Sequence, residues 1–272
     1  MHIAGLFIYP VKSLRGIAVT AADVDALGLV GDRRFLVIGE DGKFLTQRQL
    51  PRMAQITTAL SAGQITLSAD GLGSLAIATR SDPAAPLRTV AVWKSEGLQA
   101  EDCGEAAATW LGDALQLKCR LVRIGEKFQR PVLKKAAHPG DAFSFADGAP
   151  VLVTSEASLA TLNDRILENA GEPVPMDRFR PNVVIAGCAS FAEDEWRSFR
   201  AGTVTLRQAG KSDRCIMTTT DQRTGARGKE PLRTLATFRR DPVEPSSVYF
   251  GANYINESKQ GRLRVGDAVE PG

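Results

Sequence analysis

Cys215 lies in a stretch of the sequence whose residue types could do chemistry. Lys211 and Arg214 are its close cationic neighbours, and a nearby positive charge favours the thiolate over the thiol. Between Lys211 and Arg240 there are eight lysine and arginine residues and three acidic residues, a net charge of +5, whereas the whole chain carries +3. A soft thiolate in a locally positive region suits a metal carried on an anionic cofactor. Free cysteines are more often small buried hydrophobic residues, and that interpretation stays open.

Composition restricts the classes of function. The 272 residues, 43% hydrophobic and 24% charged, are enough for two domains or one large all-β domain of ordinary globular composition. The slight positive charge and the lack of a basic run with interleaved aromatic residues argue against nucleic-acid binding. Only His2 and His138 are histidines, so a Cys-His hydrolase would need His138, and a His-rich metal site is excluded.

The cysteine pattern and the N-terminus indicate the compartment. Four cysteines without a CxxC pair argue against a disulfide framework and against a zinc site. The chain enters a strand-like run directly, without the charged and apolar regions of a signal peptide. No apolar stretch approaches the roughly 18 residues that a membrane helix needs. We therefore expect a soluble, reduced, cytoplasmic protein that does not enter a membrane and has no targeting segment.

Short strands must position most of these residues. Alternating or apolar runs predict strands over residues 3–9, 17–24, 34–40, 44–47, 55–60, 64–68, 74–79, 88–93 and 117–124. Asp41-Gly42 is typical of a two-residue hairpin, and one amphipathic helix is expected over 104–115. Strands of this length and spacing favour an antiparallel barrel or sandwich.

The second half begins after a proline- and glycine-containing segment, residues 125–150, which predicts a long loop or linker. Helices are expected from Thr154-Ser155 to Asn169 and over 231–240. Strands are expected over 151–153, 183–186, 203–208, 214–219, 249–255 and 262–269. The sequence thus predicts a mainly β fold with a few helices, divided near residue 125 into parts 1–124 and 125–272.

Several polar patches lie at the predicted strand ends. Lys12 and Arg33 are ordinarily solvated surface charges, Thr154-Ser155 an ordinary helix cap, and Asn182 an ordinary turn residue. Taken together, however, the patches form a recognisable set. Tyr-Pro-Val-Lys-Ser at 9–13 and Gly-Asp-Arg-Arg-Phe at 31–35 resemble the opening of the MOSC N-terminal β-barrel domain. Phe-Arg-Pro-Asn at 179–182, Arg-Cys at 214–215 and Lys-Glu-Pro-Leu-Arg-Thr-Leu at 229–235 resemble the MOSC domain proper.

The resemblance covers nearly the whole chain and implies a two-part β-barrel architecture, with a MOSC N-terminal β-barrel domain over 1–124 and a cofactor-binding MOSC domain over 125–272. The two-domain arrangement is similar to the mitochondrial amidoxime-reducing component and its bacterial relatives. These enzymes hold a molybdenum cofactor and reduce N-hydroxylated compounds. The resemblance therefore implies a molybdenum-dependent oxidoreductase acting on amidoximes, N-hydroxy bases or N-oxides, although tungsten is not excluded.

Carried over residue by residue, the resemblance implies that Cys215 is the metal ligand and a catalytic residue, beside the dithiolene of the pterin. It also implies a cofactor-binding set in which cations meet the phosphate and the other polar groups meet the pterin: Lys12, Arg33, Arg180, Arg214, Ser13, Thr154, Ser155 and Asn182. Arg34 competes with Arg33, and only one of the pair should face inward. Asp221 is the candidate acid beside the metal, or else the residue of an Asx-turn.

Partners follow from the same resemblance. No cysteine follows Cys215, so an attached iron–sulfur domain is not expected, and electrons must come from a separate ferredoxin-like protein or flavoprotein. A basic surface could dock it, unless it is simply a solvated face: Arg223, Arg227, Lys229, Arg239 and Arg240. Cys119 and Cys188 are expected in the core, and Cys103 has no evident role. Two other functions stay open, a sulfur transferase with a persulfide on Cys215 and a non-catalytic carrier of the molybdenum cofactor.

Overall fold

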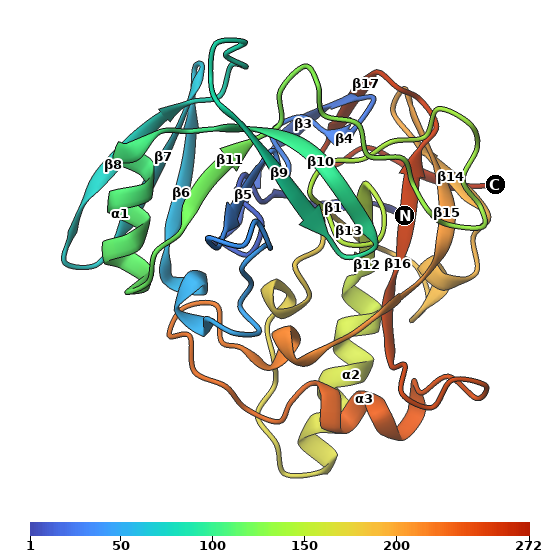
Figure 1. Cartoon of the computed structure of the whole chain (residues 1–272). Helices are drawn as coiled ribbons and strands as arrows, with labels where there is room; N and C mark the ends of the chain where they lie inside the picture. The colour runs from blue at the N-terminus through green and yellow to red at the C-terminus, as the bar shows by residue number, and fades with distance from the viewer.

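The computed structural model describes all residues, 1–272 (Figure 1). It contains eighteen strands, three α-helices and four short 3-10 helices. The mainly β class with a few helices, predicted from the periodicity, is confirmed. None of its helices is both long enough and apolar enough to cross a membrane.

An eight-stranded sheet organises the C-terminal part, in the order β18-β14-β15-β16-β12-β13-β1-β2. Its strands are β1 (His2–Ile8), β2 (Ile17–Val19), β12 (Val151–Ser155), β13 (Val183–Ala186), β14 (Ser198–Ala201), β15 (Val204–Asp213), β16 (Tyr249–Asn256) and β18 (Val269–Pro271). Only β12 and β13 pair in parallel. A three-stranded sheet of β3 (Ala21–Asp25), β4 (Gly28–Leu29) and β17 (Gly261–Arg264) closes over it. Both sheets contribute to one core of 18 buried residues, which include Ile3, Val24 and Tyr254.

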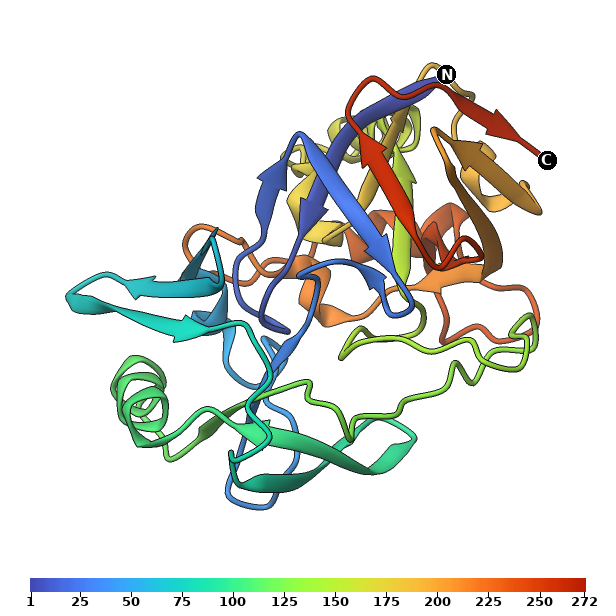
Figure 2. The ribbon, with the colours of Figure 1, turned by 90° about the horizontal axis from the view of Figure 1, so that it is seen from above.

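Two smaller sheets form the N-terminal part, seen apart from the large sheet in Figure 2. One has the order β5-β11-β10-β9, and the other has the order β6-β7-β8. Their strands are β5 (Phe35–Ile38), β6 (Thr57–Ser61), β7 (Gln64–Ala69), β8 (Leu72–Ala78), β9 (Leu87–Val92), β10 (Ser95–Asp102) and β11 (Arg120–Arg123). Helix α1 (Glu105–Leu115) buries Ala107, Leu111 and Leu115 against them.

Helices α2 (Glu156–Glu168) and α3 (Leu232–Phe238) lie together at the lower end of the molecule in Figure 1. Their apolar residues Leu162, Ile166 and Leu235 share a core with Phe179 and Phe250, whose rings stack 3.8 Å apart. The short 3-10 helices are η1 (Pro51–Gln55), η2 (Met176–Phe179), η3 (Ala192–Asp194) and η4 (Ile216–Thr219).

Four strand predictions were wrong, two of them for local reasons. Residues 216–219 form η4 because the hydroxyl and amide of Thr218 both donate to the carbonyl of Cys215, which turns the chain out of the sheet. Residues 44–47 form no strand beyond a bridge from Phe44 to Ile38, because the hydroxyl of Thr46 accepts from the amide of Arg48 and begins a turn. Residues 17–24 and 262–269 are each divided between two sheets. Strands β4, β10 and β14 were not predicted.

The connection between the two parts brings distant segments together. Strand β1 pairs with β13, and β3 pairs with β17, although both precede the N-terminal sheets in the chain. Strands β2 and β4 join them by pairing with β1 and β3. The division at residue 125 therefore stays a prediction about sequence domains, while hydrogen bonding joins residues 2–29 to the C-terminal part. Residues 125–150 contain no helix or strand, as predicted.

Candidate functional site

A cleft of about 530 Å³ lies where the two parts meet. Eight lysine and arginine residues and two aspartates line it, a formal excess of six positive charges. Six of the predicted site residues other than Cys215 contribute to the lining: Lys12, Ser13, Arg33, Arg180, Asn182 and Arg214. Cys215 is the only cysteine among the lining residues. The cleft can therefore attract an anion and offer it one soft ligand.

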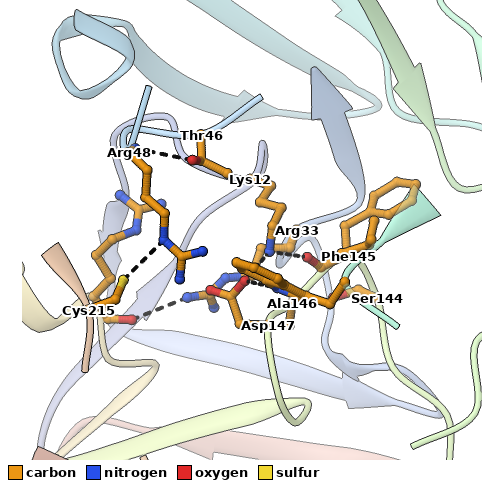
Figure 3. Close-up of polar contacts among 12 residues, drawn as sticks. Lys12, Arg33, Thr46, Arg48, Ser144, Phe145, Ala146, Asp147 and Cys215 are labelled. Atoms are coloured by element: carbon orange, nitrogen blue, oxygen red, sulfur yellow. Dashed lines mark hydrogen bonds and ion pairs between the residues drawn. The ribbon is translucent and has the colours of Figure 1, made fainter. Parts of the chain in front are cut away.

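Cys215 lies at the junction between β15 and η4. Its carbonyl accepts from the amide of Thr218 at 3.0 Å, so its backbone is held at the start of the 3-10 helix. Its half-buried Sγ accepts a hydrogen bond from Nε of Arg48 at 3.3 Å (Figure 3). Burial raises the pKa of Cys103 to about 12, of Cys119 to about 11 and of Cys188 above its ordinary value.

Arg214 lies beside the thiol with one nitrogen unpaired. Its Nε donates to the carbonyl of Phe250 at 2.8 Å, and its Nη1 donates to the carbonyl of Phe179 at 3.2 Å. Nη2 is buried and has no hydrogen-bond partner. Burial lowers the pKa of Arg214 to about 10, so the group remains a cation at neutral pH. An anion in the cleft could satisfy this donor.

Arg33 and Arg180 pack on one aromatic ring. Their guanidinium carbons lie 4.4 and 4.3 Å from the ring centroid of Tyr9. Arg33 is further held by Asp32 at 2.7 Å and by Oδ1 of Asn182 at 3.0 Å. Both arginines have a positive φ, 47° and 53°, in the left-handed region that non-glycine residues seldom adopt. The Tyr9 ring therefore helps to hold two cations in place. In the sequence Tyr9 was only part of a motif and had no predicted role.

Arg33 and Arg34 differ in position. Arg33 lines the cleft, whereas Nη2 of Arg34 pairs with Asp25 at 2.7 Å and donates to the carbonyl of Leu29 at 3.1 Å, away from it. Neither residue lies within a strand, so the turn before β5 and not strand alternation separates them. Of this pair, Arg33 is the one available to a ligand in the cleft.

Lys12 is buried and already paired. Its Nζ lies 2.5 Å from Oδ1 of Asp147 and donates to the carbonyl of Phe145 at 2.8 Å (Figure 3). Burial lowers the pKa of Lys12 to about 8, against the opposing effect of Asp147. Burial also opposes ionisation of Asp147, but Lys12 and the indole of Trp93, 2.7 Å away, lower its pKa below the usual range. Ser13 lines the cleft next to Lys12.

Three predicted residues do not line the cleft. Thr154 and Ser155 are fully buried; the hydroxyl of Thr154 contacts the sulfur of Met176, and that of Ser155 accepts from the amide of Ser158 as the cap of α2. Asp221 forms the Asx-turn that was its alternative interpretation, accepting from the amides of Arg223 and Thr224. Its second oxygen pairs at 2.9 Å with Arg178, which does line the cleft.

Sequence reasoning missed Arg48, Trp93 and Asp147. The guanidinium carbon of Arg48 lies 4.3 Å from the Trp93 ring, and Trp93 donates to Asp147. Asp147 belongs to the segment 125–150, and a long loop of this kind often carries function, which was the one available signal. Arg48 and Trp93 offered none, since Arg48 follows the predicted strand 44–47 as an ordinary polar residue and Trp93 ends the predicted strand 88–93 as an ordinary aromatic residue.

The fold and the cleft define a mainly β protein in two parts, with one thiol in a cationic cleft between them. Residues 1–118 match the MOSC N-terminal beta barrel domain, and residues 140–270 match the MOSC domain. Over 98% of its length the chain is 37% identical to mitochondrial amidoxime-reducing component 1 of Mus musculus, of which it covers 81%. It is equally similar to that of Homo sapiens and to mitochondrial amidoxime reducing component 2 of Bos taurus, with 37% identity, 98% of this chain and 82% of each relative. The chain belongs to this family of two-domain MOSC proteins, as its motifs predicted.

Proposed function

We propose that this protein is a molybdenum-cofactor oxidoreductase that reduces N-hydroxylated compounds with electrons from a separate donor protein. The observation that carries the proposal is one accessible thiol, Cys215, in a cleft with an excess of six positive charges. The relatives that are 37% identical over 98% of the chain are amidoxime-reducing components by name, which supports the same reaction class.

The cleft residues fit such a cofactor. Cys215 is the soft ligand for the metal, and the buried, unpaired Nη2 of Arg214 could donate a hydrogen bond to an anionic group of the cofactor. Arg33 and Arg180, fixed on Tyr9, present guanidinium groups of the kind that bind phosphate. A bound cofactor would supply the metal that takes oxygen from the substrate and stores the two electrons needed.

The remaining cleft residues define what the chain itself contributes. Reduction of an amidoxime to an amidine and water consumes two electrons and two protons. Asp147 is held as a carboxylate by Lys12 and Trp93, so it can accept hydrogen bonds from the N–H groups of an amidoxime. Trp93, 41% exposed, gives the adjacent wall an apolar face. In this proposal Asp221 acts only through Arg178, which it orients.

Metal content and turnover test the proposal. The chain, purified from a host that makes the cofactor, should contain about one molybdenum per chain and reduce benzamidoxime with a chemical electron donor. Cys215→Ala should keep the pterin, since the cationic residues that hold it are intact, but lose reduction. Cys188→Ala is the matched control, because Cys188 lies outside the cleft and should keep both.

Other results would favour the rival functions. Cyanide-releasable sulfur on Cys215 in a metal-free protein would support sulfur transfer. A bound cofactor without turnover would support a carrier. Reduction that persists in Cys215→Ala would show that the ligand assignment is wrong.

A further inference from the structure

Arg48 is the only residue that donates a side-chain hydrogen bond to the Cys215 sulfur. It comes from the N-terminal part, 167 residues before the cysteine, and its Nε lies 3.3 Å from Sγ. Figure 3 shows its side chain reaching across the cleft toward Cys215. A contact across such a sequence separation is made by the tertiary fold and not by the local chain.

The position of Arg48 is fixed at both ends. Its amide donates to the hydroxyl of Thr46 at 3.1 Å, and its carbonyl accepts from Nη2 of Arg227, which also binds the carbonyl of Gln47 at 2.8 Å. At the other end its guanidinium carbon lies 4.3 Å from the ring centroid of Trp93. Stacking on an aromatic ring restricts the rotation of an arginine side chain. The guanidinium is therefore delivered to the sulfur by the surrounding structure.

A hydrogen bond to a metal-bound sulfur changes the reduction potential of the metal. The N–H withdraws electron density from the thiolate, and the positive charge stabilises whichever oxidation state is more negative. Both effects favour the reduced metal. Removing them should lower the reduction potential.

We propose that Arg48 is a positioning residue: it orients the Cys215 sulfur through an N–H···S hydrogen bond and thereby raises the reduction potential of the metal bound there. The N-terminal part thus contributes a group that tunes a ligand of the C-terminal part. This inference rests on the proposed function, because it concerns the metal that Cys215 would bind.

The first experiment uses the cofactor-free chain. Cys215 is alkylated at one pH with anionic iodoacetate and with neutral iodoacetamide, and mass spectrometry gives the site-specific rates. Both reagents react with the thiolate, so the rate with iodoacetate divided by the rate with iodoacetamide is independent of the thiolate fraction. This ratio reports the charge beside the sulfur. Arg48→Met should lower the ratio about fivefold, since one cation near contact distance is lost. Arg48→Lys should retain the ratio within about twofold. An unchanged ratio in Arg48→Met would overturn the proposed contact.

The second experiment uses the metal-loaded chain. Potentiometric titration followed by electron paramagnetic resonance gives the potential of the one-electron couple. A fivefold effect corresponds to a decrease of about 40 mV in Arg48→Met. In Trp93→Ala the guanidinium loses its platform, and a smaller decrease is expected. Arg264→Met, an exposed arginine of β17 outside the cleft, is the matched control and should leave the potential unchanged.

The outcomes separate the two claims. A chain that binds no molybdenum overturns the proposed function, and with it the proposed role of Arg48 in setting the reduction potential. A loaded Arg48→Met variant with the parental potential overturns the role of Arg48 alone. A reduction potential that is lower in Arg48→Met and closer to the parental value in Arg48→Lys supports this role, because a merely structural role would not depend on the charge of residue 48.

Discussion

Arg214 carries a buried guanidinium nitrogen that no protein atom accepts from. A buried donor left unsatisfied costs about 1–3 kcal/mol, so the protein tolerates a local penalty that an anionic ligand would remove. Arg33 and Arg180 are prepared differently, since Tyr9 holds both against its ring. At the residue scale the cations of the site are therefore preorganised for binding an anion.

Lys12 makes anion binding dependent on pH. Burial lowers its pKa to about 8, so the ammonium is present at pH 7 and largely lost at pH 9. Deprotonation removes a cation and leaves the carboxylate of Asp147 uncompensated. The affinity of the cofactor-free chain for inorganic sulfate, whose charge is constant in this range, should fall about tenfold from pH 7 to pH 9.

Isothermal titration calorimetry at the two pH values measures this change. Lys12→Met should bind sulfate more weakly at pH 7 and show little further loss at pH 9. An equal loss in the parent and in Lys12→Met would assign the effect to another group.

At the scale of elements, β16 positions the cleft through its pairing with β12. Gly251 in β16 has a φ of +73°, and a Cβ there would lie 2.5 Å from the carbonyl oxygen of Val153. The preceding residue, Phe250, offers the carbonyl that holds Arg214. Close approach of these two strands therefore determines where that guanidinium lies.

Gly251→Ala should lower the free energy of unfolding by roughly 3 kcal/mol or more, because strain at positive φ adds to a clash between the strands. Gly210→Ala separates the two causes. Gly210 also has a positive φ, +102°, but nothing lies within 4 Å of its Cβ position, so about 1–2 kcal/mol of strain alone is expected. Urea denaturation gives both values. Similar losses in the two variants would contradict the clash.

At the scale of the whole molecule, the cleft exists only because two parts of the chain meet. A second hollow, about 590 Å³, borders it and shares Arg178 with it. Exposed cations line this hollow, among them Arg223, Arg227, Lys229 and Arg233. Arg239 and Arg240, also predicted on the basic surface, do not line it, and Arg239 pairs with Asp194. Arg227 binds the carbonyl of Arg48, whose side chain contacts Cys215. If the proposed function holds, we expect an acidic electron donor to dock on this basic surface.

Lys229→Glu should slow association with an acidic ferredoxin or flavoprotein about tenfold at low salt, without changing reduction by a small chemical donor. Arg264→Glu is the matched charge reversal on β17, at the opposite end of the molecule from α3 in Figure 1. Stopped-flow kinetics at several ionic strengths measures both. An equal effect of the two variants would point to net charge and not to this surface.

The periodicity of the sequence by itself determined the strand-rich class, α1, the capped start of α2 and the loop over 125–150, because hydrophobic alternation and caps are local properties. Its motifs indicated Cys215 and the cations Lys12, Arg33, Arg180 and Arg214. Motifs did not separate lining residues from buried ones such as Thr154 and Ser155, because a hydroxyl at a helix start looks alike in both roles.

Only the tertiary structure decided what faces Cys215. Arg48, Trp93 and Asp147 reach the cleft from the N-terminal part and the connecting loop, and Arg48 is 167 residues away in the chain. Their role depends on how the two parts pack, and packing between distant segments leaves no periodic or short-range signal in the sequence. The thiol could be read from its neighbours in the chain, but its hydrogen-bond donor could be found only from its neighbours in space.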